Sequence, residues 1–259
     1  MLDFQQIKAQ YPENLQRFER TILREYLQYK ILQAIFDSQY ASKLSFLGGT
    51  ALRIIHGNQR FSEDIDLDNF DLSWEEFEEV IQKVKRFMEL EGFEVEIRNV
   101  ARDAYHCYLK VPALLYEQGI SALQGEKILI QVDTSAQGFL YEPEPVLLSK
   151  FDIFTYVRVT PLDILLSQKI FTAINRKRPK GRDFFDITFL SGLTKPDMGF
   201  LSEKLGVDTP ETVKKEVSTR IAAFDFKKLA EDFSPFVISQ GDIQRVEKFQ
   251  EFWEQVKLE

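Results

Sequence analysis

The chain has 259 residues, of which 44% are hydrophobic and 29% are charged, so it can bury a core and is not of the disordered class. Its net charge of −8 argues against a general nucleic-acid-coating protein, because nonspecific binding to a polyanion needs a basic field. The single cysteine, Cys107, excludes an internal disulfide and a cysteine-based metal cluster. No apolar run reaches the roughly 18 residues of a membrane span, and the N-terminus lacks a signal-peptide core. We therefore expect a cytoplasmic protein without membrane association.

Apolar periodicity and capping residues define the elements expected in the first part of the chain. Apolar residues recur at three- and four-residue steps over residues 14–38, which predicts a long helix with one buried stripe. Ser73 and Glu76 have the spacing of a capping box at the start of a later helix, which Gly92 ends. The expected elements are helices over 14–38, 51–55 and 73–91, a strand over 44–47 and a strand centred on 65–67.

The pattern changes twice in the remainder of the chain. From residue 93 to about 158, β-branched and aromatic residues predict strands, the clearest over 93–97, 104–111 and 127–132. After Pro161 no strand signal returns, and glycines and prolines separate helical patterns. We therefore predict an α/β (α+β) chain with an α/β domain over 1–158, which includes the N-terminal helix, and a helical domain over 159–259. The helices expected in the second domain cover 161–175, 182–191, 195–205, 209–224, 226–233 and 242–256.

One stretch has the pattern of a phosphoryl-transfer site. Gly48 and Gly49 follow a strand and precede a short helix, so backbone N–H groups can approach a phosphate without an intervening Cβ. Thr50 either caps that helix or contacts a phosphate oxygen. Asp64 and Asp66 are expected on one face of the next strand, because residues two apart project together. Carboxylates this close repel each other unless a cation lies between them, and hard oxygen ligands suit Mg²⁺ or Mn²⁺.

Two pairs of motifs resemble those of a known family. The run Phe-Leu-Gly-Gly-Thr-Ala-Leu at 46–52, followed by Arg-Phe-Ser-Glu-Asp-Ile-Asp-Leu at 60–67, resembles the signature of the AbiEii/AbiGii toxin family. This family lies within the DNA polymerase β-like nucleotidyltransferase superfamily, whose pattern is Gly-Ser, a spacer and Asp-x-Asp; Thr50 stands here where serine is commoner. Lys-Ile-Phe-Thr-Ala at 169–173 and Arg-Asp-Phe-Phe-Asp-Ile at 182–187 are similar to the family's later motifs. The resemblance spans about residues 44–190.

The resemblance implies a polymerase β-like nucleotidyltransferase core with a mixed sheet, followed by a mostly helical C-terminal region. In such enzymes a third carboxylate comes from a neighbouring strand, and Asp133 is the candidate by position and order; otherwise Asp133 is a turn former at the end of its strand. Lys169 on its own would be read as a solvated helix residue, and the resemblance instead makes it catalytic. Asp183 can cap its helix, pair with an arginine or serve the site, and ranks above Asp186. The implied sets are Asp64, Asp66, Asp133, Lys169 and Asp183 for catalysis, Asp64, Asp66 and Asp133 for the metal, and Gly48, Gly49, Thr50, Arg60, Ser62 and Lys169 for the nucleotide, with Lys169 and Asp183 contributed by the helical domain.

A cluster of cations and two histidines complete the candidate residues. Five cations occupy seven positions from 176 to 182, a local basic patch that is compatible with a nucleic-acid acceptor. His56 and His106 have no companions at ligand spacing, so we do not expect a catalytic histidine. His56 is expected near the end of a short helix, where a cation suits the dipole. The predicted acceptor-binding residues are Arg176, Lys177, Arg178, Lys180 and Arg182.

These observations predict a metal-dependent nucleotidyltransferase that transfers NMP from an NTP to an acceptor hydroxyl and releases pyrophosphate, with Mg²⁺ or Mn²⁺ as cofactor. The resemblance implies the toxin of a bacterial toxin–antitoxin or abortive-infection system active in phage defence, with tRNA as acceptor and a cognate antitoxin as partner. Two alternatives stay open. One is a small-molecule nucleotidyltransferase of the kind that modifies antibiotics, and the other is a non-catalytic nucleotide-binding regulatory module.

Overall fold

The computed structural model describes residues 2–239 and 241–259, and the chain forms two compact units. Unit 1 consists of the residues up to Ala51 together with Ser62–Val159, and unit 2 consists of Leu52–Phe61 and Thr160–Glu259. The chain therefore leaves unit 1 after Ala51 and returns to it at Ser62. The segment 52–61 was expected in the first domain, and the structure assigns it to the helical unit instead.

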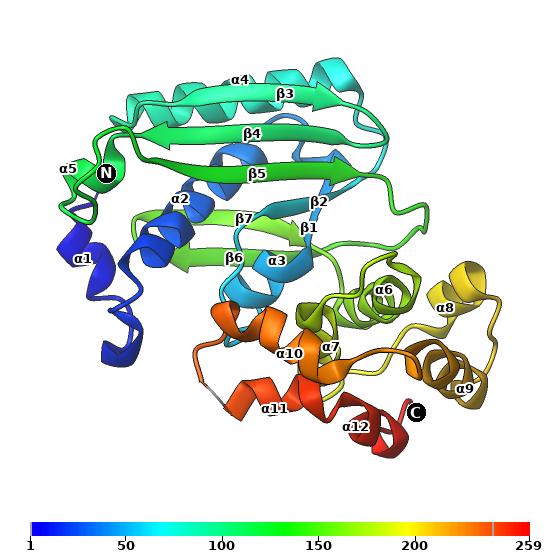
Figure 1. Cartoon of the computed structure of the whole chain (residues 1–259). Helices are drawn as coiled ribbons and strands as arrows, with labels where there is room; N and C mark the ends of the chain where they lie inside the picture. Colours follow the sequence, from blue (N-terminus) through cyan, green and yellow to red (C-terminus); the bar gives the residue numbers. More distant parts are fainter. Residues whose placement is uncertain (1, 240) are drawn as a thin grey trace. The chain divides into compact units, whose positions relative to one another are not determined.

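Unit 1 is built on a seven-stranded mixed sheet with the order β3-β4-β5-β2-β1-β7-β6 (Figure 1). The pairs β1–β2, β3–β4, β4–β5 and β6–β7 are antiparallel, whereas β2–β5 and β1–β7 are parallel. This arrangement confirms the mixed sheet that the sequence predicted. The strands are β1 (Leu44–Leu47), β2 (Ile65–Asn69), β3 (Glu96–Ala101), β4 (Tyr105–Pro112), β5 (Lys127–Ser135), β6 (Glu144–Lys150) and β7 (Ile153–Val159).

Two long helices pack on this sheet, as Figure 1 shows. Helix α2 (Glu19–Phe36) contacts β5 and β7, and α4 (Trp74–Leu90) contacts β3 and β4. The capping box of α4 forms as predicted, because the Ser73 side chain accepts from the backbone N–H of Glu76 while the Glu76 side chain accepts from that of Ser73. The other helical segments of this part are α1 (Phe4–Lys8), α3 (Gly48–Ile54), α5 (Leu114–Glu117) and 3₁₀ turns at Glu13–Leu15 and Ala41–Lys43.

Burial alternates along the strands near the β3 edge of the sheet. On β4, Cys107 and Leu109 are buried, whereas His106 and Tyr108 are only half-buried and Lys110 is exposed. The same alternation runs along β5, from exposed Lys127 to half-buried Ser135. A strand that is buried on one face only shows this pattern, because successive side chains point to opposite faces. The face that carries His106 and Tyr108 is therefore the less covered face of this part of the sheet.

The structure refines several expected elements. The first long helix begins at Glu19 rather than at residue 14, because a 3₁₀ turn occupies Glu13–Leu15. The strand expected over 93–97 is β3 at Glu96–Ala101, while Phe93 and Val95 are buried ahead of it. The hairpin of β6 and β7 had no individual prediction, although 93–158 was expected to be rich in strands.

Unit 2 is helical after Val159, as the sequence predicted. Its buried centre includes Phe184, whose ring lies 4.8 Å from that of Phe249, and Trp253, which stacks on Phe249 at 5.9 Å. The helix expected over 242–256 is two helices. The elements are α6 (Leu162–Asn175), α7 (Gly181–Leu190), α8 (Met198–Leu205), α9 (Pro210–Ile221), α10 (Phe226–Phe233), a 3₁₀ turn (Ser234–Phe236), α11 (Gly241–Glu247) and α12 (Phe249–Gln255). Among the described residues, no helix is both long enough and apolar enough to cross a membrane.

Candidate functional site

The first motif folds around a close approach between Gly48 and Asp66 in unit 1. Antiparallel pairing of β1 with β2 sets Leu47 opposite Asp66, so the turn into α3 begins beside this carboxylate. Gly48 has a φ of +81°, and a Cβ built on it would lie 2.2 Å from Asp66 Oδ2. Glycine is required here for two reasons, the left-handed backbone and the space that the carboxylate fills. The glycine was expected because of the approach of a phosphate, whereas the structure shows the carboxylate of the same motif in that space.

Hydrogen bonds join the two halves of the motif. The Thr50 side chain is fully buried, and its hydroxyl donates to the backbone carbonyl of Asp64. Because a hydroxyl has one hydrogen, the Thr50 hydroxyl cannot at the same time donate to a phosphate oxygen. Thr50 is also not the cap of α3, because this helix begins at Gly48 and Thr50 lies inside it. Gln28 on α2 donates from Nε2 to the carbonyls of Ser62 and Glu63, at 3.1 and 2.9 Å. The loop that leads to Asp64 is thus fixed from two sides.

Gln28 is a site-supporting residue that sequence reasoning missed. It is 1% exposed on α2, where it interrupts a run of buried apolar residues. A buried amide must have hydrogen-bond partners, so a glutamine within a predicted core stripe was a usable signal. The sequence did not show that the partners of Gln28 are the carbonyls before Asp64.

Asp133 lies beside Asp66 in the sheet. The parallel pairing of β2 with β5 sets Asp66 opposite Asp133, and paired residues of neighbouring strands face the same side. The Asp133 carboxylate accepts from Gln131 Nε2 at 2.8 and 2.9 Å, and His106 Nδ1 lies 2.7 Å from its Oδ1. Asp133 is therefore inside a strand and held in place, so the alternative that it is a turn former is wrong. The contact with His106 could not be read from the sequence, because it depends on the register of β4 against β5.

The oxygen donors of unit 1 suit a hard divalent cation that also binds substrate phosphates. Asp64 directly precedes β2, and Asp66 and Asp133 share a register position on neighbouring strands. Asp68, two residues further, is buried and accepts from the Gln137 N–H at 2.9 Å and the Tyr141 hydroxyl at 2.8 Å, so it has a structural role. Within residues 2–239 and 241–259, no three His, Cys, Asp or Glu side chains are already grouped to hold a metal. The assignment of Asp64, Asp66 and Asp133 to a metal stays a prediction, and their oxygen donors are of the kind used in Mg²⁺ sites that combine one or two carboxylates with phosphates.

A second cluster of charged residues surrounds Asp186 in unit 2. Asp186 on α7 is fully buried, and Arg60 binds both of its oxygens, from Nε at 2.7 Å and from Nη2 at 2.6 Å. Asn58 Nδ2 donates at 3.0 Å, and Lys169 Nζ lies 2.8 Å from Oδ2. Because the Arg60 side chain is 2% exposed and engaged with Asp186, the structure gives it a different partner from the nucleotide predicted for it. The contacts of Asn58 and Arg60 with Asp186 also explain why the segment 52–61 belongs to unit 2.

Burial opposes the negative charge of Asp186, but the positive charges of Arg60 and Lys169 outweigh it and lower the pKa of this carboxyl to about 2. Asp183, also buried, lies 3.3 Å from Lys169 Nζ and 3.2 Å from Arg176 Nη1. Of the roles considered for Asp183, pairing with an arginine is therefore the one that the structure shows. Lys169 is 14% exposed and bound to two carboxylates, so it is not a solvated helix residue.

The remaining predicted residues have simpler surroundings. Lys177, Arg178 and Lys180 are exposed between α6 and α7, and Arg182 is half-buried at the start of α7. His56 has a buried Nε2 without a hydrogen-bond partner among the described residues, and burial lowers its pKa. Burial disfavours the charged form of His56, which opposes the cationic role expected for it at the helix end.

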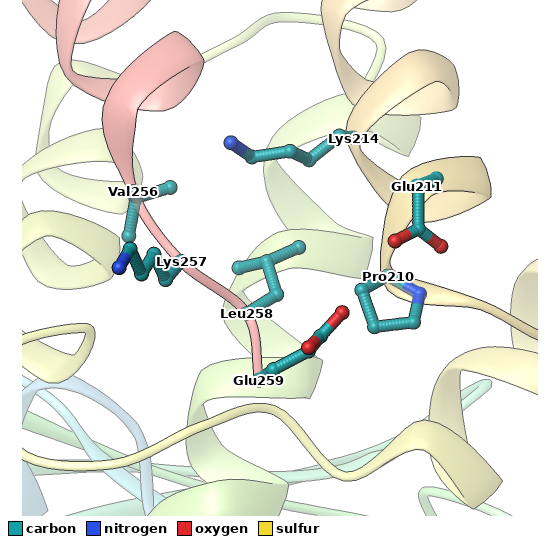
Figure 2. A pocket seen from close by; sticks show the side chains of 7 residues that line it. All are labelled: Pro210, Glu211, Lys214, Val256, Lys257, Leu258 and Glu259. Carbon is teal, nitrogen blue, oxygen red and sulfur yellow. The ribbon is translucent and has the colours of Figure 1, made fainter.

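A separate pocket of about 330 Å³ lies in unit 2, where α9 begins (Figure 2). Its lining includes Lys214 and Glu211 from α9 and Leu258 from the segment after α12, as Figure 2 shows. None of the predicted catalytic, nucleotide-binding or acceptor-binding residues lines this pocket. This pocket is therefore separate from the candidate site.

Comparisons with known proteins concern the family and the fold of the chain. The sequence matches the family described as "Nucleotidyl transferase AbiEii toxin, Type IV TA system" over residues 30–252. No curated protein matches the chain. The fold is similar to that of the crystal structure of JHP933 from Helicobacter pylori, with a TM-score of 0.55 and 14% identity over 92% of this chain and 93% of that chain. It is also similar to a "putative nucleotidyltransferase from H. pylori", with a TM-score of 0.54 and 15% identity over 92% and 96% of the two chains. These likenesses confirm the predicted fold class.

The contact between Gly48 and Asp66 predicts a specific effect of Gly48→Ala. The matched control is Gly92→Ala in the same unit, because Gly92 also has a positive φ, +94°, but a Cβ added to it would have no atom within 4 Å. Each variant should lose roughly 1–2 kcal/mol of unfolding free energy to backbone strain. Only Gly48→Ala should also displace Asp66 and reduce incorporation of label from an α-labelled NTP, by at least about tenfold. Equal activity of the two variants would show that the space at Gly48 is not needed by the site.

The network around Asp186 predicts that Asp186→Asn destabilises unit 2 by about 3–5 kcal/mol at pH 7, because Arg60 and Lys169 would lose their buried counter-charge. The pKa of Asp186 is lowered on folding, so its charge stabilises the fold at pH values above about 4 and this contribution is lost as the pH falls toward 2. The stability difference between parent and variant should therefore shrink below about pH 4.

Urea unfolding in a Trp74→Phe background measures this, because buried Trp253 then reports on unit 2 alone. Asp232→Asn, at an exposed aspartate of the same unit, is the control and should change stability by less than about 0.5 kcal/mol. A difference between parent and Asp186→Asn that stays constant from pH 7 to pH 3 would contradict the assignment of this charge.

Proposed function

The chain belongs to the AbiEii nucleotidyltransferase toxin family, and we propose that it transfers a nucleoside monophosphate from an NTP to a hydroxyl group of an RNA acceptor. The observation that carries this proposal is the position of Asp66. This carboxylate lies against the glycine turn at Gly48 and beside Asp133 in the neighbouring strand. A turn that begins a helix next to paired carboxylates is suited to a nucleotide triphosphate and the cation that neutralises it.

The roles of the unit 1 residues follow from their positions. Backbone N–H groups of Gly49 and Thr50, at the start of α3, bind phosphate oxygens, since the first N–H groups of a helix have no intrahelical partner. Asp64 and Asp66 would hold a divalent cation, Mg²⁺ or Mn²⁺, together with the triphosphate of the nucleotide. When bound, the cation neutralises charge on the triphosphate and on the leaving pyrophosphate.

The reaction exchanges one phosphorus–oxygen bond for another. The oxygen of the acceptor hydroxyl forms a bond to the α-phosphorus, and the bond from that phosphorus to the oxygen bridging to the β-phosphate breaks. Asp133, which Gln131 and His106 hold in place, orients the hydroxyl and accepts its proton on the way to solvent. Pyrophosphate leaves and the acceptor keeps the nucleoside monophosphate. The assignment of Lys169 and Asp183 to catalysis stays a prediction from the resemblance.

The family is described as the toxin of a Type IV toxin–antitoxin system, and from this we infer the biological setting. The acceptor that we propose is tRNA, whose modification would stop translation and could abort a phage infection. A cognate antitoxin would restrain the toxin. The exposed cations Lys177, Arg178 and Lys180 support an RNA acceptor, because they place positive charge on the surface of an acidic chain.

Replacement of Asp66 by Ala should abolish transfer, because it removes the carboxylate that faces both the glycine turn and Asp133. The assay incubates the purified chain with each α-labelled NTP, Mg²⁺ and bulk tRNA. Transfer of label to RNA should fall by at least about a hundredfold in Asp66→Ala and should be retained in Asp103→Ala, at an exposed aspartate of the same unit.

Equal labelling by the parent and Asp66→Ala would contradict the proposed site. Label that reaches only a small molecule when the assay is repeated with a cell lysate would replace RNA with a small-molecule acceptor. Metal-dependent NTP binding without transfer to any component would favour the regulatory module.

The basic patch predicts a change in RNA affinity. Lys177 and Arg178 are replaced by Ala together, and Arg176 is kept because it pairs with Asp183. The variant should bind tRNA several-fold more weakly, and its salt dependence should flatten by roughly 0.9 in the slope of log K against log salt for each lost phosphate contact.

Lys227→Ala with Lys228→Ala is the control for this test, because it removes the same charge from an exposed surface of unit 2. The control should bind tRNA like the parent chain. Unchanged affinity and unchanged salt slope in the Lys177/Arg178 variant would remove the patch from the proposed acceptor site.

A further inference from the structure

The less covered face of β3, β4 and β5 carries an organised set of polar side chains. Cross-strand pairing sets Arg98, Tyr108 and Gln131 in one row, and directly opposite residues of antiparallel strands project to the same side. The next row, further from Asp133, contains Glu96, Lys110 and Leu129. Arg98, Lys110 and Leu129 are exposed, the last to 42%, so this face is open to solvent.

Positive charge exceeds negative charge on this face, although the chain as a whole is acidic. The cations are Arg98, Lys110 and Lys127. The carboxylates are Glu96, which lies 2.6 Å from Lys127 Nζ, and Asp133 at the end nearest the candidate site. The Arg98 guanidinium lies over the Tyr108 ring, 5.5 Å from its centre, so a base that stacks on this ring would lie beside the guanidinium or take its place. A ring on which a base can stack, flanked by cations for phosphates, is the combination that binds unpaired nucleotides.

The face is continuous with the candidate site. The row of Tyr108 is two residues from the row of His106 and Asp133, which is about 7 Å along the strand. Asp66 follows Asp133 in register on the adjacent strand. A nucleotide stacked on Tyr108 would therefore lie close to a hydroxyl group held at Asp133. The covering helices α2 and α4 contact β5 and β3–β4 from the apolar side, where Leu109 and Ile130 are buried.

We infer that the face formed by Arg98, Tyr108, Lys110, Leu129 and Gln131 binds the unpaired end of the RNA acceptor and presents its hydroxyl to the Asp66–Asp133 row. Tyr108 stacks on a base, Arg98 and Lys110 bind phosphates, and the Leu129 side chain contacts the next base. The inference rests on the proposed function, because it names the surface that the RNA acceptor of that reaction occupies.

A protein partner would require a different surface. The core of a protein–protein interface is depleted of charged residues and rich in aromatic and other apolar side chains. That composition occurs at the other edge of the same sheet, where Leu147, Phe154 and Tyr156 on β6 and β7 are 40%, 71% and 64% exposed. The cationic face of β3–β5 is complementary to RNA instead.

The test measures binding of a fluorescent single-stranded RNA hexanucleotide to the full chain by anisotropy, without nucleotide or metal. Tyr108→Ala should weaken binding about tenfold through the loss of stacking, whereas Tyr108→Phe keeps the ring and should stay within twofold of the parent. Arg98→Ala with Lys110→Ala should reduce the slope of log K against log salt by roughly 1.4, because each lost contact with a single-strand phosphate contributes about 0.7. Lys85→Ala on α4 removes one cation elsewhere in unit 1 and should leave binding unchanged.

Several results would overturn the inference. They are absent binding by the parent, parent-like binding by Tyr108→Ala, and equal affinity for the hexanucleotide and for a duplex of the same sequence, whose bases are not free to stack. Failure of this proposal is distinguishable from failure of the proposed function. Label transfer to an acceptor without hexanucleotide binding would overturn only the surface, and hexanucleotide binding with the expected variant pattern but no transfer would overturn only the reaction.

Discussion

The Asp66 carboxylate lies in the space next to Gly48 that any other residue would fill with its own Cβ. Because of this close approach, the first residue of the turn after β1 must be glycine, since the Asp66 side chain on β2 occupies the place of a Cβ. The buried hydroxyl of Thr50 then connects the start of α3 to the carbonyl of Asp64. Gln28 holds the same loop from the side of α2. The glycine turn and the carboxylates thus form one structural unit before any ligand is bound.

The helical unit uses buried charge in a different way. Asp186 is an acid without solvent exposure, and it is tolerated because a bidentate guanidinium, an amide and an ammonium group surround it. A buried carboxylate that loses such partners is costly, so the network selects one arrangement of α6, α7 and the 52–61 segment. Lys169 is held between Asp183 and Asp186, which defines the direction of its ammonium group. One continuous sequence motif therefore supplies residues to both compact units, since Arg60 lies between Thr50 and Asp64 in the chain.

The sheet of unit 1 divides its less covered face into two chemically different regions. Around Tyr108, cations accompany an aromatic ring on β3, β4 and β5. Around Phe154 and Tyr156, on the hairpin at the other edge, the exposed side chains are mainly aromatic and aliphatic. The first region suits a charged polymer and the second suits another protein surface, and both belong to one continuous sheet. The first region is the surface that we propose for the RNA acceptor.

The sequence by itself determined the type and approximate position of most elements and the identity of the first motif. These predictions rest on local features, which can be read directly from the order of residues. The features are the period-two and period-3.6 patterns, the Ser73–Glu76 capping box and the spacing from Gly48 to Asp66. What the sequence could not determine depends on contacts between distant residues. Arg60, in the 52–61 segment, is 126 residues away from Asp186 in the sequence. The pairing of these two side chains joins the segment to the helical unit. The contact of His106 with Asp133 and the row from Asp66 to Tyr108 exist only because β2, β4 and β5 pair in one register. Register and buried ion pairing are decided by the packing of the whole unit, which is why only the tertiary structure revealed them.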